Sequence, residues 1–226
     1  MSYELGIIGG MGPLATDVFY EYIIRHTEAS CDQEHIDIVL LNHASMPDRT
    51  QAILTGREEE FLQAVQRDFD LLNTVALKAV AIPCNTSHYF YDSMTAMSRA
   101  PIINMIEECM LACKAAGHDS IVVFGTQGTL RSGLYERYAQ KHGLNSVCVS
   151  EEDREKIMEI IYDVKATNRT ESEALQELIQ KYSARGKVIL ACTELSVLAP
   201  ADGSVVDALK VLAERAIERC GRSVKK

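Results

Sequence analysis

Short apolar runs alternate with amphipathic stretches along most of the chain. The apolar runs have the length and composition of buried strands and cover residues 3–8, 36–41, 78–83, 102–103, 120–124, 146–149 and 187–191. Apolar positions spaced three to four residues apart predict helices at residues 14–29, 57–76, 89–97, 105–116, 130–141, 151–165, 171–183 and 205–220. Regular alternation of strands and helices predicts an α/β fold with mainly parallel sheets.

The pattern occurs twice. Each half has a strand followed by a glycine turn and a helix, with turns at Gly10–Leu14 and Gly125–Leu130, and each half has a later strand that ends in a cysteine. Pro101 interrupts the chain after the helix at 89–97 and marks a crossing between the halves. We therefore predict two pseudo-symmetric, doubly wound lobes with the active site at their interface. The predicted lobes are residues 1–98 plus 205–226 and residues 99–204.

Composition limits the function classes. Of 226 residues, 47% are hydrophobic and 24% charged, as in ordinary globular proteins. The net charge of −9 and the lack of a basic cluster before the last few residues argue against nucleic-acid binding. Neither a charged-then-apolar leader nor an apolar run of about 20 residues is present, so we expect a cytoplasmic protein that does not bind a membrane.

Seven cysteines, an odd number at scattered spacings, indicate reduced thiols. Cys109 and Cys113 lie four residues apart on a predicted helix, but no further ligands converge on them, so we expect no metal site. The cysteines that we interpret as small packing residues are Cys31, Cys109, Cys113, Cys148 and Cys220.

The other two cysteines, Cys84 and Cys192, each end a predicted strand and precede residues that can start a helix. This is where open α/β sheets bind ligands, and helix amides favour a thiolate there. The polar residues after each cysteine offer hydroxyl, amide and backbone donors to a carboxylate. Two opposed thiols can move a proton off one face of a carbon and onto the other without a metal or organic cofactor. Two structural thiols, or a disulfide, are the alternative.

The first glycine turn suggests a competing function. Gly10-Met11-Gly12-Pro13-Leu14-Ala15 matches the looser dinucleotide fingerprint. However, the second strand ends in Leu41-Asn42 instead of an acidic residue, and Pro13 removes an amide from the turn. Binding of an anion or carboxylate fits this turn better, and a nucleotide-binding α/β protein stays open as an alternative.

Three motifs together resemble the aspartate/glutamate racemase family, which is independent of pyridoxal phosphate. They are Gly6–Pro13, Ile82–His88 and Ala191–Leu195. The resemblance covers nearly the whole chain and implies two α/β domains with the site between them, a small amino-acid substrate, no cofactor, and a homodimer. Glutamate racemases usually have Cys-Thr-His where this chain has Cys192-Thr193-Glu194, which favours the aspartate-racemase-like branch.

The resemblance also implies roles for nine residues, of which Cys84 and Cys192 correspond to the two catalytic bases. From its position two residues after Cys192, Glu194 either assists proton transfer or caps its helix. The positions implied for the α-carboxylate are Asn85, Thr86, Thr126 and Thr193, with Met11 nearby. Arg49 and Lys165 are similar to the two cations that bind the side-chain carboxylate in the aspartate branch. His88, one helical turn after Cys84, either contacts that thiol or is a buried, hydrogen-bonded histidine.

We therefore expect a cofactor-independent amino-acid racemase acting on aspartate, with glutamate or a broader range open. Maleate isomerase, hydantoin racemase and decarboxylase are alternatives within the same superfamily. A decarboxylase would be expected to keep only one of the two cysteines.

Overall fold

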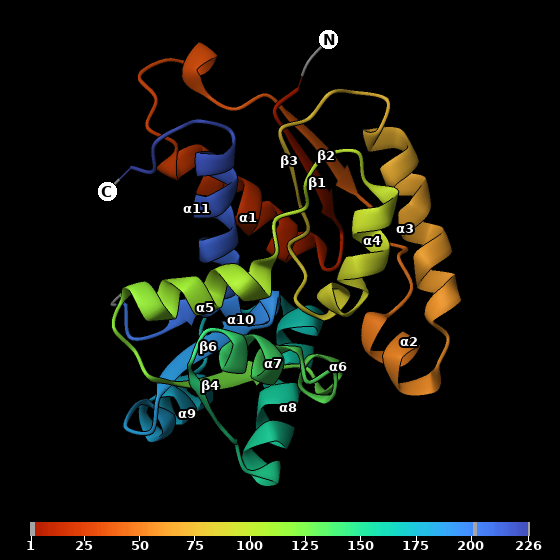
Figure 1. Ribbon diagram of the computed structural model, residues 1–226. Coiled ribbons are helices and arrows are strands. Elements are labelled where there is room, and N and C mark those ends of the chain that lie inside the picture. The colour runs from red at the N-terminus through yellow and green to blue at the C-terminus, as the bar shows by residue number, and fades with distance from the viewer. Residues whose placement is uncertain (1–2, 201–202, 226) are drawn as a thin grey trace.

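The computed structural model describes residues 3–200 and 203–225 and contains two parallel sheets. The first has the order β2-β1-β3, formed by β1 (Leu5–Gly9), β2 (Ile38–Asn42) and β3 (Ala79–Ala81). The second has the order β5-β4-β6-β7, formed by β4 (Ser120–Gly125), β5 (Asn145–Val147), β6 (Lys187–Ala191) and β7 (Val206–Asp207). Figure 1 shows one sheet above the other, each with helices around it.

The two sheets share one topology. In both, the first strand lies between the second and the third, and all pairs are parallel. Ile102 forms an isolated parallel bridge to Val80, in the position that β7 holds beside β6. Cys84 follows β3 and Cys192 follows β6, so the two cysteines occupy equivalent places in the two halves. The predicted fold class, with two pseudo-symmetric lobes, is confirmed.

Eleven α-helices occur in the described part of the chain. Their bounds are α1 (Pro13–His26), α2 (Arg49–Thr55), α3 (Glu58–Leu72), α4 (Tyr91–Met97), α5 (Met105–Ala115), α6 (Gln127–Arg131), α7 (Leu134–Lys141), α8 (Glu151–Thr167), α9 (Glu173–Ser183), α10 (Thr193–Val197) and α11 (Ala208–Arg219). Two short 3-10 helices, Asp32–Glu34 and Thr86–Phe90, complete the set.

Strand side chains alternate between separate cores, because successive residues of a strand point to opposite faces. Ile7 packs into a central core that continues through both lobes, whereas Ile8 packs into the outer core of the first lobe. In β4, Val123 joins the central core and Phe124 the outer core of the second lobe. Strands β1, β3, β4 and β6 are buried on both faces, which explains why they appear as continuous apolar runs in the sequence, whereas the edge strands β2 and β5 are partly exposed.

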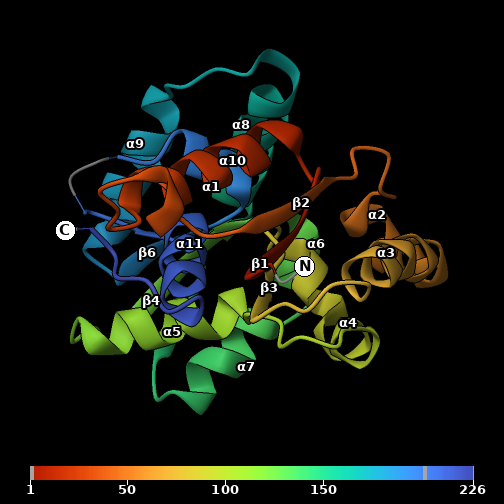
Figure 2. The ribbon, with the colours of Figure 1, turned by 90° about the horizontal axis from the view of Figure 1, so that it is seen from above.

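The central core extends through α5 and α11, the helices that connect the lobes. Helix α5 follows the bridge at Ile102 but packs on α7 and β7 of the second lobe. Helix α11 follows β7 but packs on α1 and β3 of the first lobe, and it also contacts α5. Figure 2 shows α1 and α11 side by side. The two lobes therefore share a core, and the exact division at residues 98 and 205 stays a prediction.

Several stretches differ from the predicted elements. Ile102 forms only an isolated bridge where a short strand was predicted. Residues 49–55 form α2, although no helix was predicted there, because Asp48 caps its first turn and the left-handed Gly56 ends it. The predicted helix 130–141 is instead α6 and α7, separated at Gly133, whose φ is 63°. The predicted helix 205–220 begins with strand β7, since Val206 pairs with β6 before α11 starts.

Candidate active site

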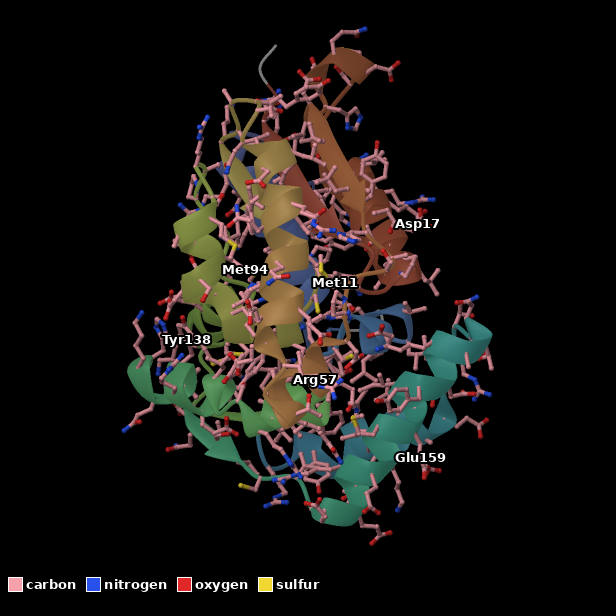
Figure 3. All side chains as sticks on the ribbon, turned by 90° about the vertical axis from the view of Figure 1, so that its right-hand side faces the viewer. Met11, Asp17, Arg57, Met94, Tyr138 and Glu159 are labelled. Carbon is pink, nitrogen blue, oxygen red and sulfur yellow. The ribbon has the colours of Figure 1, made fainter. Side chains whose placement is uncertain are left out.

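A small cavity lies where the carboxyl ends of β3 and β6 meet. The residues that line it are Met11, Asp48, Arg49, Thr50, Cys84, Asn85, Thr86, Thr126, Lys165, Cys192, Thr193 and Glu194. All ten residues singled out in the sequence are in this set, although they come from six separate segments of the chain. Met11, which is 3% exposed, lies inside the molecule between the upper and lower parts in Figure 3. Asp48 and Thr50, which flank Arg49 at the start of α2, were not predicted from the sequence.

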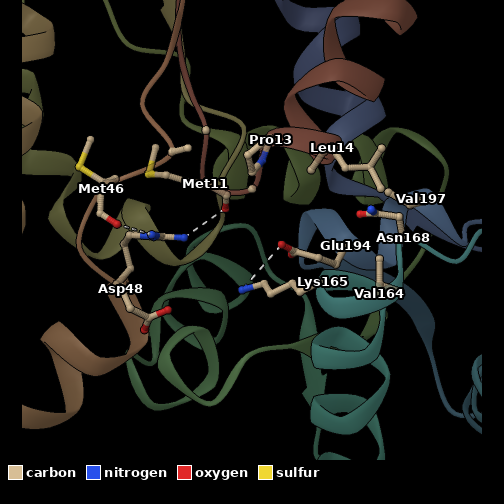
Figure 4. Close-up of a pocket in the computed structure, with 15 residues that line it drawn as sticks. Met11, Pro13, Leu14, Met46, Asp48, Val164, Lys165, Asn168, Glu194 and Val197 are labelled. Carbon is tan, nitrogen blue, oxygen red and sulfur yellow. Dashed lines mark hydrogen bonds and ion pairs between the residues drawn. The ribbon is translucent and has the colours of Figure 1, made fainter.

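The cavity is nearly closed. Its volume is about 20 Å³, enough for about one water molecule, whereas an adjoining outer pocket measures about 490 Å³. Five residues line both spaces: Met11, Asp48, Arg49, Lys165 and Glu194. Figure 4 shows the outer pocket, with the Lys165–Glu194 ion pair on the side opposite Met46 and Asp48. A ligand much larger than water therefore fits the inner cavity only if these side chains move apart.

Cys84 is held through its backbone. Its carbonyl accepts hydrogen bonds from Ser87 Oγ at 2.7 Å and from His88 Nδ1 at 2.9 Å. His88 Nε2 in turn accepts from the amide of Met105 at 3.2 Å, so the proton of the neutral ring is on Nδ1. Burial lowers the pKa of His88, which keeps the ring neutral. His88 therefore positions the Cys84 turn and is the buried, hydrogen-bonded histidine of the two readings above.

Cys192 is held through its thiol. Its Sγ donates to Glu194 Oε2 at 2.9 Å. Burial raises the pKa of Cys192 well above the usual value, and the charge and hydrogen bond of Glu194 raise it further, while Lys165 opposes them. The helix dipole was expected to favour a thiolate here. However, α10 is only five residues long, and its effect is smaller than that of burial next to a carboxylate. Cys192 is therefore a thiol in this structure.

Lys165 reaches the cavity from the last turn of α8. Its Nζ lies 3.7 Å from Glu194 Oε1. Burial disfavours the lysine charge, but Glu194, Cys192 and Cys84 together outweigh burial and raise the pKa of Lys165. The lysine thus stays cationic, and a charge on either sulfur raises its pKa further, which suits it to stabilise a thiolate or a bound carboxylate.

Arg49, the first residue of α2, points back over the glycine turn. Its Nη2 donates to the carbonyl of Met11 at 3.1 Å and its Nη1 donates to the carbonyl of Pro47 at 3.1 Å. Its Nε is buried and has no hydrogen-bond partner among the described residues. A guanidinium with a free donor at the cavity wall is well suited to bind a carboxylate.

Three threonine hydroxyls join the lobes beside the cysteines. Thr86 Oγ1 lies 3.0 Å from the hydroxyls of both Thr126 and Thr129, which are 3.1 Å from each other. Thr126 also caps α6 by accepting from the amide of Thr129. A hydroxyl can donate or accept, so these groups can rotate to donate to an incoming carboxylate. Thr129 was not among the residues predicted for the site, although it belongs to the predicted turn at 125–129.

The first glycine turn differs from a nucleotide-binding turn. Its Gly10 amide donates to Thr16 Oγ1 at 2.9 Å and so is not available to a phosphate. A Cβ at Gly10 would lie 2.4 Å from the His43 carbonyl carbon, which shows how closely the turn packs against the loop after β2. Gly10 has a φ of 87°, so glycine is needed on two grounds.

Within residues 3–200 and 203–225, no group of three or more His, Cys, Asp or Glu side chains is arranged to hold a metal ion. Among the same residues, no helix is both long and apolar enough to cross a membrane.

Comparison with known proteins agrees with the geometry. The model of the Asp/Glu/Hydantoin racemase family matches residues 8–216. The chain belongs to this family. The match extends from β1 to α11 and confirms the resemblance, and with it the expectation of an isomerase of the racemase type. A curated member of similar length is a broad-specificity amino-acid racemase of Bacillus subtilis (strain 168), 26% identical over 203 residues and covering 86% of each chain.

Solved structures of the family also resemble this chain. Aspartate racemase of Picrophilus torridus has a TM-score of 0.87 and 28% identity, covering 99% of this chain and 96% of the other. A putative Asp/Glu racemase from Yersinia pestis has a TM-score of 0.79 and 27% identity, covering 97% and 99%. Glutamate racemase of Campylobacter jejuni subsp. jejuni, at 17% identity and a TM-score of 0.59, shares the fold and covers 99% and 88%.

Proposed function

We propose that this protein is a cofactor-independent amino-acid racemase that acts on aspartate, with Cys84 and Cys192 as its two bases. The observation that carries the proposal is that two cysteines at equivalent strand ends, far apart in sequence, line one cavity. In the proposed complex the α-carbon lies between the two sulfurs, and each sulfur serves one face.

The proposed proton transfer follows from the different surroundings of the two sulfurs. The Cys84 thiolate takes the α-proton, and the electron pair of the C–H bond stays on the substrate as a carbanion. Cys192, already a thiol, then donates its proton to the opposite face, which inverts the configuration. For the next turnover Cys84 loses the abstracted proton to solvent, and Cys192 regains one from solvent by way of Glu194 Oε2, which lies 2.9 Å from Cys192 Sγ. The reverse reaction uses the same groups with their roles exchanged.

Substrate binding is assigned from the donors around the cavity. Thr86, Thr126 and Thr193 offer hydroxyls to the α-carboxylate, and Asn85 offers an amide donor beside them. Arg49 and Lys165 are the two cations among the residues that line the cavity, and they suit a second carboxylate. A dicarboxylic amino acid therefore matches the charges, and aspartate is the shortest one. Because the Bacillus relative has broad specificity and an outer pocket adjoins the cavity, glutamate and other amino acids should be tested beside aspartate.

The experiment incubates the purified protein with L-aspartate in deuterated water without added cofactor. We expect exchange of the α-proton by NMR and formation of D-aspartate by chiral chromatography, and the same from the D enantiomer. Cys84→Ala and Cys192→Ala each abolish racemisation, whereas Cys148→Ala, an exposed cysteine, retains it. If either of the first two variants turns over at the parental rate, the two-base scheme is wrong.

The alternatives within the superfamily are separated in the same assays. Loss of optical activity from a 5-substituted hydantoin, with no exchange of aspartate, supports hydantoin racemisation. Conversion of maleate to fumarate supports a maleate isomerase, in which one cysteine adds to the double bond. Binding of a nucleotide in a titration, with no exchange of the α-proton of aspartate, supports the nucleotide-binding alternative.

We also propose a cytoplasmic homodimer, as the family resemblance implies. Light scattering on the purified protein tests the oligomeric state against the 25.1 kDa chain mass. A mass near that of one chain at micromolar concentration argues against a dimer. Cell fractionation followed by immunoblotting tests the cellular location.

A further inference from the structure

The Asn85 side chain is bonded at one end only. Its Oδ1 accepts a hydrogen bond from the Tyr135 hydroxyl at 2.6 Å. Its Nδ2 is buried, lacks a hydrogen-bond partner among the described residues, and belongs to a residue that lines the cavity and is 3% exposed. A buried hydrogen-bond donor without a partner destabilises the folded protein by about 1–3 kcal/mol. Such a donor in the wall of a cavity is therefore explained if a bound ligand accepts the hydrogen bond.

Tyr135 determines which end of the amide is free. It is 1% exposed in α7 of the second lobe, whereas Asn85 follows Cys84 in the first. Burial, reinforced by the neighbouring Cys109 thiol, raises the pKa of Tyr135 well above its usual value, so the hydroxyl keeps its proton at working pH. Donation to Oδ1 leaves Nδ2 for the cavity. An amide rotated by 180° would instead direct Oδ1, a second acceptor, at a bound carboxylate.

We propose that Tyr135 is a positioning residue that holds the Asn85 amide with its donor toward the substrate carboxylate. The proposal rests on the proposed function only in taking a carboxylate as the ligand. Because the bond joins the two lobes, the amide has the productive orientation only when the lobes are correctly packed. Nothing in the sequence motifs pointed to Tyr135, since it lies fifty positions from Asn85.

The test compares Tyr135→Phe with the parent protein. The phenylalanine keeps the ring and removes only the hydroxyl, so that the Asn85 amide is free to rotate. The probe is succinate, which has both carboxylates of aspartate but no stereocentre and does not turn over. By calorimetric titration we expect the Kd for succinate to rise about fivefold to tenfold. In steady-state assays the KM for both aspartate enantiomers rises by a similar factor, and kcat changes less.

The matched control is Tyr182→Phe. Tyr182 is also 1% exposed and its hydroxyl is bonded to a buried carboxylate, that of Asp153, at 2.7 Å. This control loses stability but binds succinate with the parental Kd. In an Asn85→Ser background, Tyr135→Phe has no further effect on succinate binding, because the amide through which Tyr135 acts is gone.

The outcomes separate the two proposals. A folded Tyr135→Phe variant with the parental Kd overturns the positioning role, as does an equal loss of binding in the Asn85→Ser background. If Tyr135→Phe does not fold, Asn85→Asp carries the test, because Tyr135 then leaves a second acceptor facing the ligand. We expect Asn85→Asp to bind succinate more weakly than Asn85→Ser does. Equal or tighter binding by Asn85→Asp overturns the positioning role of Tyr135. Normal succinate dependence without racemisation of aspartate refutes the proposed function alone.

Discussion

The contact between the lobes at Gly128 is the sharpest place to perturb the site without touching a reacting group. A Cβ added there would lie 2.9 Å from Thr50 Oγ1, 3.0 Å from Thr50 Cα and 3.0 Å from Thr86 Cγ2. Each distance is about 0.4 to 0.5 Å shorter than the 3.4 Å at which ordinary contact begins. The Thr50 backbone and the buried Thr86 side chain cannot shift on their own to make room. In Gly128→Ala we therefore expect helix α6 to move away from the first lobe by roughly 0.4 to 0.5 Å.

The expected effect is larger on activity than on stability. Overpacking costs about 1–3 kcal/mol, and alanine in a helix recovers about 1 kcal/mol relative to glycine. The melting temperature therefore falls by only a few degrees. Thr126, which caps α6, moves with the helix. Since a misplacement of about 1 Å can cost about a hundredfold in rate, we expect kcat/KM for aspartate to fall about tenfold.

The assay is racemisation of both aspartate enantiomers, followed by circular dichroism, with thermal unfolding measured in parallel. The control is Gly143→Ala, where φ is 65° and nothing lies within 4 Å of the added carbon. Strain there costs about 1–2 kcal/mol, so stability falls while kcat/KM stays at the parental value. A Gly128→Ala protein with parental kcat and KM would show that the packing of α6 on Thr50 and Thr86 does not set the geometry of the site.

Three further predictions concern charge. In Glu194→Gln the loss of the carboxylate lowers the pKa of Cys192, so alkylation of this cysteine by iodoacetamide, followed by peptide mass spectrometry, shifts to lower pH. Lys165→Met removes the cation that lowers the pKa of Cys192, so alkylation of Cys192 shifts to higher pH. Because this cation is also assigned to a substrate carboxylate, the KM for aspartate rises about tenfold or more. Hydrogen bonds from Lys181, Ser150 and Tyr182 lower the pKa of Asp153. Asp153→Asn therefore melts below the parent above about pH 5, and the gap closes as pH falls below about 4.

Each of these predictions has its own control. Alkylation of the exposed Cys148 reports the general effect of pH and is the same in all three proteins. Shifts of Cys192 in the same direction for Glu194→Gln and Lys165→Met would contradict the assigned electrostatics. For Asp153, a folded-state pKa below the unfolded value stabilises the protein only while the carboxylate is ionised. A melting gap that widens on acidification would refute that assignment.

The sequence predicted most of the site because the chemistry is local to the ends of strands. A cysteine at the end of a buried apolar run lies at the carboxyl edge of a parallel sheet, where ligands bind. Because the pattern occurs twice, the sequence predicted that Cys84 and Cys192 face the same site. The contributions of α2 and Tyr135 could not be predicted in the same way. Helix α2 is short, and its start depends on Asp48 capping; the Tyr135 contact depends on how α7 packs across the lobe boundary.

The two cysteines hold equivalent backbone positions but have unequal chemical surroundings. Among the described residues, only Cys192 donates to a carboxylate, whereas the carbonyl of Cys84 is bound by Ser87 and a neutral His88. In the proposed two-base scheme, an enzyme that rests with Cys192 as the thiol accepts the enantiomer whose α-proton faces Cys84. The other enantiomer reacts only with the form in which Cys84 is the thiol and Cys192 the thiolate. Racemisation has an equilibrium constant of one, so kcat/KM must be equal for the two directions. The unequal surroundings created by Glu194 can therefore make kcat differ between the two enantiomers, but KM must then differ by the same factor.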